Sequence, residues 1–134
     1  MPGHQRSDTM RGMKTVTLRD GTPVTVRPVR PDDGPRLQAA FARLSEQTIY
    51  LRFLAPRESL TRAELEHLVT IDGDRRMVFL ATVPENGEER VIGGAQYAAL
   101  PDRPHLAEAA VTVDDSFQGR GLGSLLLREL GDVR

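Results

Sequence analysis

Three glycines alternate with other residues near the end of the sequence, in the stretch Gln118-Gly119-Arg120-Gly121-Leu122-Gly123-Ser124. The apolar residues that follow predict a helix, so the glycines stand where a loop would meet a helix N-terminus. The first N–H groups of a helix have no partner within it, and the helix dipole adds partial positive charge there. Glycines let an anion approach this backbone, and Arg120 adds a full charge. The stretch therefore predicts a phosphate or pyrophosphate site.

Two common phosphate-binding motifs do not fit this stretch. A Walker loop ends in Gly-Lys-Ser or Gly-Lys-Thr, and the stretch has no lysine. A dinucleotide-binding loop needs the spacing G-x-G-x-x-G and an acidic residue about 20 residues further on. Here the spacing is G-x-G-x-G, and only eleven residues follow Gly123. From the loop alone, the simpler alternative that the glycines merely permit a tight turn stays open.

The elements that must position this loop follow from the pattern of apolar residues. Alternation predicts a hairpin with strands near 15–18 and 24–29, where Pro28 suggests an edge strand or a strand end. Asp32 or Asp33 is expected to cap a helix over 34–44, and Ser45 a second helix that ends at Pro56. The capping box Thr61-Arg62-Ala63-Glu64 predicts a third helix.

The second half of the sequence predicts three strands and a final helix. The strands are expected at 77–83, 91–100 and 105–113, with Asn86-Gly87 as the first turn and residues 101–104 as the second. The last helix is expected to begin near Gly119 or Arg120, and its apolar residues recur at helical spacing. This order of elements predicts an α+β fold, with a largely antiparallel sheet flanked by helices.

Composition excludes several classes of function. The 134 residues are 39% hydrophobic and 28% charged, which is typical of one globular domain. A formal net charge of −1 gives no reason to expect a nucleic-acid partner. The absence of cysteine excludes disulfides, thiolate zinc sites and a cysteine nucleophile. No apolar run is long enough for a membrane span or a signal peptide, so a cytoplasmic location without membrane association is expected. Residues 1–13 are expected to form a flexible leader.

The glycine stretch resembles the signature Q/R-x-x-G-x-G/A of the GNAT superfamily of N-acetyltransferases. The preceding residues Glu108-Ala109-Ala110-Val111-Thr112-Val113 look like that family's fourth strand. The residues from Leu18 to Asp33, and Tyr50-Leu51-Arg52-Phe53-Leu54, resemble a bacterial branch of the family. That branch includes protein-lysine acetyltransferases and acetyltransferase parts fused to acyl-CoA synthetase-like proteins. The resemblance extends over Leu18–Arg134 and implies a GNAT-like mixed, largely antiparallel sheet.

The resemblance implies that acetyl-CoA is the cosubstrate and that no metal is required. The family binds the CoA pyrophosphate on its glycine loop, which assigns that role here to Gln118, Gly119, Arg120, Gly121, Gly123 and Ser124. It also implies that the backbone of Val111 and Val113 pairs with the pantetheine arm of CoA. Their side chains are expected to pack in the core, which is compatible with that role.

Glu108 corresponds to the acidic residue that many members of the family use as a general base. An amine acceptor is protonated at neutral pH and must lose a proton before it attacks the thioester. Strand alternation places Glu108 on one face with Ala110 and Thr112, unless a bulge interrupts the strand. The alternative is a solvent-facing Glu108 paired with Arg103 or His105.

Other polar residues are weaker candidates for a site. Tyr97 and Tyr50 could line a substrate groove but are expected to pack in the core or at its rim. Arg52 could contact an acidic substrate, or pair with Glu46 or Glu58. His67 is expected at the surface, His105 has no partner at metal-ligand spacing, and the stretch Asp72-Gly73-Asp74 is expected to form a turn and no calcium site.

GNAT domains usually continue beyond the helix at the end of this sequence, with a further strand, a helix and a hairpin. Residues 14–134 are therefore interpreted as an incomplete N-acetyltransferase domain that lacks the C-terminal strands and helix. The expected reaction transfers acetyl from acetyl-CoA to an amine, such as a lysine of an acyl-CoA synthetase. The alternatives are a non-catalytic CoA-binding or regulatory remnant and a domain that binds anions generally. The sequence leaves the oligomeric state unknown.

Overall fold

The computed structural model describes residues 13–133 except 54–56, 73–74 and 101. Nearly all of the expected leader, together with Pro56, Asp74 and Pro101, lies outside the described residues. The strands are β1 (Lys14–Thr17), β2 (Pro23–Pro28), β3 (Arg76–Glu85), β4 (Glu88–Leu100) and β5 (Arg103–Val113). The α-helices are α2 (Gly34–Ala42), α3 (Glu46–Phe53), α4 (Arg62–Val69) and α5 (Leu122–Val133), and the 3₁₀ turns are η1 (Pro31–Asp33) and η2 (Asp115–Phe117). The sequence predicts each of these α-helices and strands.

The five strands form one sheet in the order β1-β2-β3-β4-β5. All four pairings are antiparallel, so the expected α+β fold with a largely antiparallel sheet is confirmed. The β3–β4 turn is made at Asn86-Gly87, where both residues have the positive φ that such a hairpin turn requires. Within the described residues, β5 pairs with β4 alone and its other edge is open.

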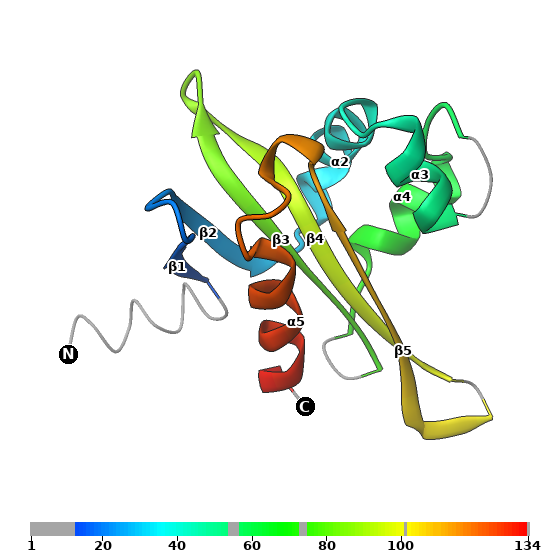
Figure 1. Ribbon diagram of the computed structural model, residues 1–134. Helices are drawn as coiled ribbons and strands as arrows, with labels where there is room; N and C mark the ends of the chain where they lie inside the picture. The colour runs from blue at the N-terminus through cyan, green and yellow to red at the C-terminus, as the bar shows by residue number, and fades with distance from the viewer. Residues whose placement is uncertain (1–12, 54–56, 73–74, 101, 134) are drawn as a thin grey trace.

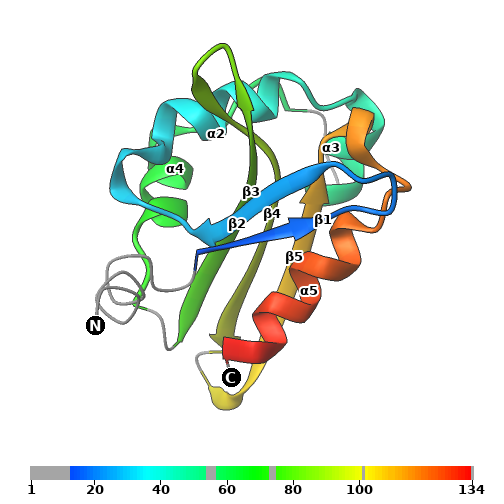
Figure 2. The ribbon, with the colours of Figure 1, turned by 90° about the vertical axis from the view of Figure 1, so that its left-hand side faces the viewer.

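The two faces of the sheet are covered differently (Figures 1 and 2). Helix α5 lies alone against one face, where Leu122, Leu126 and Leu130 pack on buried strand residues. Helices α2, α3 and α4 cover the other face, where Leu37, Val78 and other apolar side chains form smaller clusters. The chain therefore builds its core in two layers, on either side of the sheet.

Two helix starts behave as the sequence predicts. The side-chain oxygen of Thr61 accepts a hydrogen bond from the N–H of Glu64 at 3.1 Å, and the Glu64 carboxylate accepts one from the N–H of Thr61 at 2.8 Å. This reciprocal pair is the expected capping box at α4. Ser45 likewise accepts a hydrogen bond from the N–H of Thr48 at the start of α3.

Pro28 ends β2, as the strand-end alternative predicts, and β2 lies between β1 and β3, so the edge-strand alternative does not hold. Two expectations about helix starts differ from the structure in detail. Helix α5 begins at Leu122, after Gly119 and Gly121, because both glycines have a positive φ that no α-helix accommodates. Asp33 precedes α2 without capping it, because its carboxylate is bound to Arg27 and to the N–H of Arg30.

Candidate functional site

The glycine loop joins the end of β5 to the start of α5. After η2, Gly119 has a φ of 81° and Gly121 a φ of 89°, values that glycine adopts readily and other residues rarely do. The positive φ values at these two glycines direct the chain into α5. The first N–H groups of that helix carry the partial positive charge of a helix N-terminus. Gly123 lies in the first turn of α5 without a positive φ, and Ser124 follows it with an exposed side chain.

Arg120 does not supply the free positive charge that the sequence suggests. Its guanidinium forms a 2.9 Å ion pair with Asp20, in the turn between β1 and β2. The same guanidinium stacks 5.0 Å from the centre of the Phe117 ring. Hydrogen bonds from Thr22 lower the pKa of Asp20, as does Arg120 itself, so the carboxylate stays charged. The guanidinium of Arg120 therefore already has an acidic and an aromatic partner within the protein, in a partly exposed ion pair.

Arg19 is a cation beside the loop that the sequence analysis does not identify. A Cβ atom added to Gly121 would lie 3.1 Å from Arg19 Nε, so the guanidinium lies against this glycine. The N–H of Arg19 donates to the carbonyl of Arg120, and Arg19 forms no ion pair with another described residue. About one hundred residues separate Arg19 from the loop, so only the folded hairpin brings the two together.

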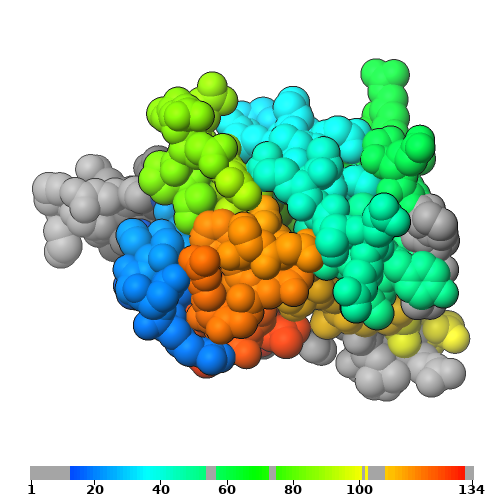
Figure 3. Space-filling view, turned by 45° about the horizontal axis from the view of Figure 1, so that its top comes forward, coloured from blue at the N-terminus to red at the C-terminus, as the bar shows by residue number. Residues whose placement is uncertain are grey.

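Hydrogen bonds tie the residues after β5 to the start of α3. The Gln118 amide donates to the Val113 carbonyl at 3.1 Å and to Thr48 Oγ1 at 3.4 Å. The Asp115 carboxylate accepts from the N–H of Ser45 at 3.0 Å and from the Thr48 hydroxyl at 3.1 Å. The Ser45 backbone N–H, with smaller contributions from the Ser45 and Thr48 side chains, lowers the pKa of Asp115. Figure 3 shows this segment between the β1–β2 turn and α3.

A groove of about 580 Å³ runs beside these hydrogen bonds, between β5 and α3, and is here called the loop-side groove. Its walls are residues Ala110–Val113 of β5 and the exposed face of α3, including Thr48, Leu51 and Arg52. The side chains of Val111 and Val113 pack on the opposite face against the α5 core, as expected. Their backbone borders the groove at the open edge of β5.

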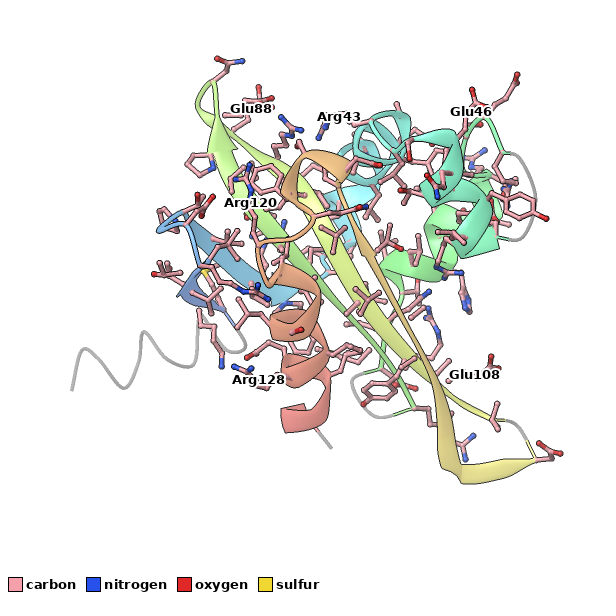
Figure 4. All side chains as sticks on the ribbon, viewed as in Figure 1. Arg43, Glu46, Glu88, Glu108, Arg120 and Arg128 are labelled. Carbon is pink, nitrogen blue, oxygen red and sulfur yellow. The ribbon has the colours of Figure 1, made fainter. Side chains whose placement is uncertain are left out.

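Glu108 lies further back along β5, in a second groove of about 670 Å³ that is here called the Glu108-side groove. Figure 4 shows Glu108 near one end of the sheet and Arg120 near the other. The register is regular from Glu108 to Val113, because the irregularity in the pairing falls at Ala99/Leu100 of β4. Glu108 therefore shares its face with Ala110 and Thr112. It is exposed and forms no ion pair with another described side chain.

The remaining candidate residues have structural surroundings that the sequence analysis partly anticipates. Tyr97 is buried in the α5 core, whereas Tyr50 is exposed on α3. Arg52 lies 5.0 Å from the centre of the Phe53 ring and lines both grooves. His67 is exposed, and it lines the Glu108-side groove with Glu64, whose pKa a hydrogen bond from Arg57 lowers to about 2. Asp72 accepts hydrogen bonds from two backbone N–H groups in its turn.

A family model described as the acetyltransferase (GNAT) family matches residues 39–132. The chain belongs to this family. The family's members are acyl-CoA-dependent transferases, and the loop and grooves occupy the segment that its model matches. The described residues contain no cluster of three or more His, Asp or Glu side chains that could hold a metal. None of the described helices is both long and apolar enough to cross a membrane.

Curated relatives and solved structures are similar to this chain over most of its length. Acetyltransferase PA5475 of Pseudomonas aeruginosa is 40% identical over 87% of the chain, and acetyltransferase Pat of Mycolicibacterium smegmatis is 36% identical over 86%. The matched regions span 62% and 34% of those two proteins. The crystal structure of the GNAT domain of S. lividans PAT superposes with a TM-score of 0.81 at 31% identity, covering 90% of this chain and 70% of that one.

Proposed function

We propose that this chain is an acetyl-CoA-dependent N-acetyltransferase domain that acts on an amine, with a protein lysine as acceptor. The observation that carries the proposal is the loop geometry: two glycines with positive φ lead from the end of β5 into the N-terminus of α5. The two grooves continue from this loop along β5 to a carboxylate. The similarity to acetyltransferases supports the reaction class, and the lysine acceptor and a cytoplasmic location remain part of the proposal.

In this proposal the anionic and reactive ends of the cosubstrate bind at different places. The pyrophosphate lies on the backbone of Gly119, Gly121, Gly123 and Ser124, beside Gln118 and Arg120, and Arg19 adds the unpaired positive charge. The pantetheine arm lies along the open backbone edge of Val111 and Val113, as an added strand would. Glu108 and Val113 are five residues apart, which corresponds to roughly 17 Å of strand. The thioester is thereby positioned toward the Glu108-side groove.

Glu108 acts as the general base of the transfer. It accepts a proton from the ammonium of the acceptor, directly or through a water molecule. The amine nitrogen then attacks the thioester carbonyl, backbone N–H groups of β5 stabilise the negative charge on its oxygen, and the C–S bond breaks as the amide forms. The CoA thiolate leaves and takes up the second proton, which the nitrogen loses as the amide forms. The acceptor lysine enters the Glu108-side groove, which residues of α3, α4 and the strands β3, β4 and β5 line.

Calorimetric titration of acetyl-CoA into the 134-residue chain tests the cosubstrate. We expect one site per chain, with competition by CoA. Failure of both molecules to bind would exclude the proposed function.

Acetylation rates test the role of Glu108 separately. Glu108→Gln should lower the rate by roughly 100-fold or more, the usual scale for a general base, while acetyl-CoA affinity stays nearly unchanged. The matched control is Glu88→Gln, because Glu88 is exposed at the opposite end of β4 (Figure 4) and should leave the rate unchanged. A rate for Glu108→Gln equal to the unsubstituted rate across neutral pH would assign the proton transfer to another group.

A further inference from the structure

An apolar cavity of about 130 Å³ lies between the sheet and helices α2, α3 and α4. All but four of its lining residues are apolar or glycine, and the polar exceptions are Arg52, Gln96, Thr112 and Asp114. Protein interiors are ordinarily close-packed, so a hollow of this size beside a candidate binding groove needs a physical cause.

The cavity arises from small residues in the floor that the sheet provides. Two rows cross this face of the sheet, Leu80–Gly94–Thr112 and Val78–Gln96–Ala110. Gly94 and Ala110 each leave space in their row where most residues would fill it. The helices opposite contribute large side chains such as Leu37, Phe41 and Phe53 to the remaining wall of the cavity.

The cavity and the two grooves meet at the same residues. Ala110 and Arg52 line all three spaces, and Thr112 lines both the cavity and the loop-side groove. Ala110 lies between the loop end of β5 and Glu108, which is the stretch along which the proposed thioester lies. An acyl group attached to that thioester would therefore extend from the groove past Ala110 into the cavity.

We propose that this cavity binds the acyl chain of CoA thioesters longer than acetyl, of about four to six carbons. The inference rests on the proposed function and names the acyl substrate class of the same site. An apolar protein cavity of about 150 Å³ is known to take up benzene, so a cavity of comparable size has room for such a chain. The transfer itself is unchanged: the amine nitrogen bonds to the carbonyl carbon, the C–S bond breaks, and the chain stays on the carbonyl carbon.

The test compares the affinities of acetyl-CoA and hexanoyl-CoA by calorimetry. The unsubstituted chain should bind hexanoyl-CoA about tenfold more tightly or better, because the added methylene groups leave water. Ala40→Leu places extra carbon atoms in the cavity and should abolish this preference while acetyl-CoA binding is retained. The matched control is Ala39→Leu on the same helix. The side chain of Ala39 is exposed, so this variant should still prefer hexanoyl-CoA to acetyl-CoA.

Two further measurements distinguish a folding defect in Ala40→Leu from a failure of the acyl-chain proposal, and that failure from a failure of the proposed function. If Ala40→Leu does not fold, Val78→Ile adds a single methyl group to the same cavity and should reduce the preference. Benzene added to the chain without CoA should shift the NMR signals of the cavity-lining methyl groups. Equal affinity for the two thioesters, or a preference that persists in Ala40→Leu, would overturn the inference. Benzene uptake without any acetyl-CoA binding would instead contradict the proposed function and with it the acyl assignment.

Discussion

Gly93 and Gly94 are neighbours in β4, and they face opposite sides of the sheet with opposite consequences. A Cβ atom on Gly93 would lie 3.2 Å from the Thr112 carbonyl oxygen and 3.3 Å from side-chain atoms of Leu122 and Leu126. A Cβ on Gly94 would meet its nearest atoms at 3.4 Å, in ordinary contact. Helix α5 is thus pressed directly onto the strand at Gly93, whereas the sheet at Gly94 borders a cavity.

The same contrast extends over both faces. The α5 face is built from close-packed apolar side chains. The other face contains the cavity and, further toward β2, a buried cluster of charges around Arg27 and Asp33. The comparison indicates that the α5 face is held by apolar packing, while the other face combines a buried polar arrangement with an apolar cavity.

The largest expected effect comes from breaking the buried charge cluster. Asp33 has no exposed surface, and its carboxylate accepts hydrogen bonds from Arg27 Nη1 at 2.9 Å and Nη2 at 2.8 Å. Asp33→Ala leaves Arg27 buried with only the partly exposed Glu89 as an ionic partner. We expect the free energy of unfolding to fall by about 3–5 kcal/mol, measured by urea denaturation. The control Asp32→Ala removes an exposed carboxylate and should change stability by less than about 0.5 kcal/mol.

The pH dependence of the free energy of unfolding provides a second test of the same charge cluster. Burial alone would raise the pKa of Asp33, but hydrogen bonds from Arg27 and from the N–H of Arg30 outweigh it and lower the pKa below the usual range. The stabilisation is therefore complete above the unfolded pKa of about 3.9 and is lost as the pH falls through the folded pKa. Stability should decline more steeply with acid in the unsubstituted chain than in Asp33→Ala. Parallel declines would show that Asp33 is not the group responsible.

The sequence predicts the elements of this fold well because their signals are local. Alternating residues, the Asn86-Gly87 turn and the capping box at Thr61 each act within a few positions, and the structure confirms them. The start of α5 is wrong because apolar spacing does not reveal backbone torsion. The positive φ at Gly121, which is a property of the folded loop, delays the helix to Leu122.

What the sequence could not predict depends on residues that are distant along the chain. The pairing of Arg120 with Asp20, and the position of Arg19 beside Gly121, require the β1–β2 hairpin to fold against the loop. The partner of Asp33 is Arg27, and a helix-cap pattern gives no sign of that competing interaction. The cavity likewise depends on which strand residues align with Gly94 and Ala110.

Substituting the two adjacent glycines tests the comparison directly. Gly93→Ala should destabilise the protein by about 1–3 kcal/mol, because the added methyl group overpacks the contact with α5. Gly94→Ala should be neutral or slightly stabilising, because its Cβ fits and the unfolded chain loses freedom. Thermal and urea unfolding of the pair measure the difference. Equal destabilisation by both substitutions would show that the two faces are packed alike.

The glycine loop leads from β5 into α5, and a second glycine pair tests its geometry. Gly121→Ala places a side chain at a φ of 89°, so the loop must change shape and CoA affinity should fall about tenfold, or about 1.4 kcal/mol. Gly123→Ala should change affinity by less than twofold. Its Cβ would lie 3.6 Å from Val111 Cγ1 and 3.8 Å from Val113 Cγ2, in ordinary contact, and its φ is not positive. Equal losses of CoA affinity in the two variants would mean that CoA binding does not depend on the positive φ at Gly121.

The smallest expected effect concerns the charge beside this loop. Arg19→Gln removes an exposed cation that forms no ion pair with another described residue, so CoA affinity should fall about threefold and depend less on salt. The double variant Asp20→Asn/Arg120→Gln removes a neutral pair, keeps the net charge, and should alter affinity less than Arg19→Gln does. Titrations of CoA at low and high ionic strength compare the two. If the double variant loses more affinity and Arg19→Gln loses none, Arg120 provides the charge that binds the pyrophosphate, as the sequence alone suggests. The contact between the β1–β2 turn and the loop would then serve only to position that residue.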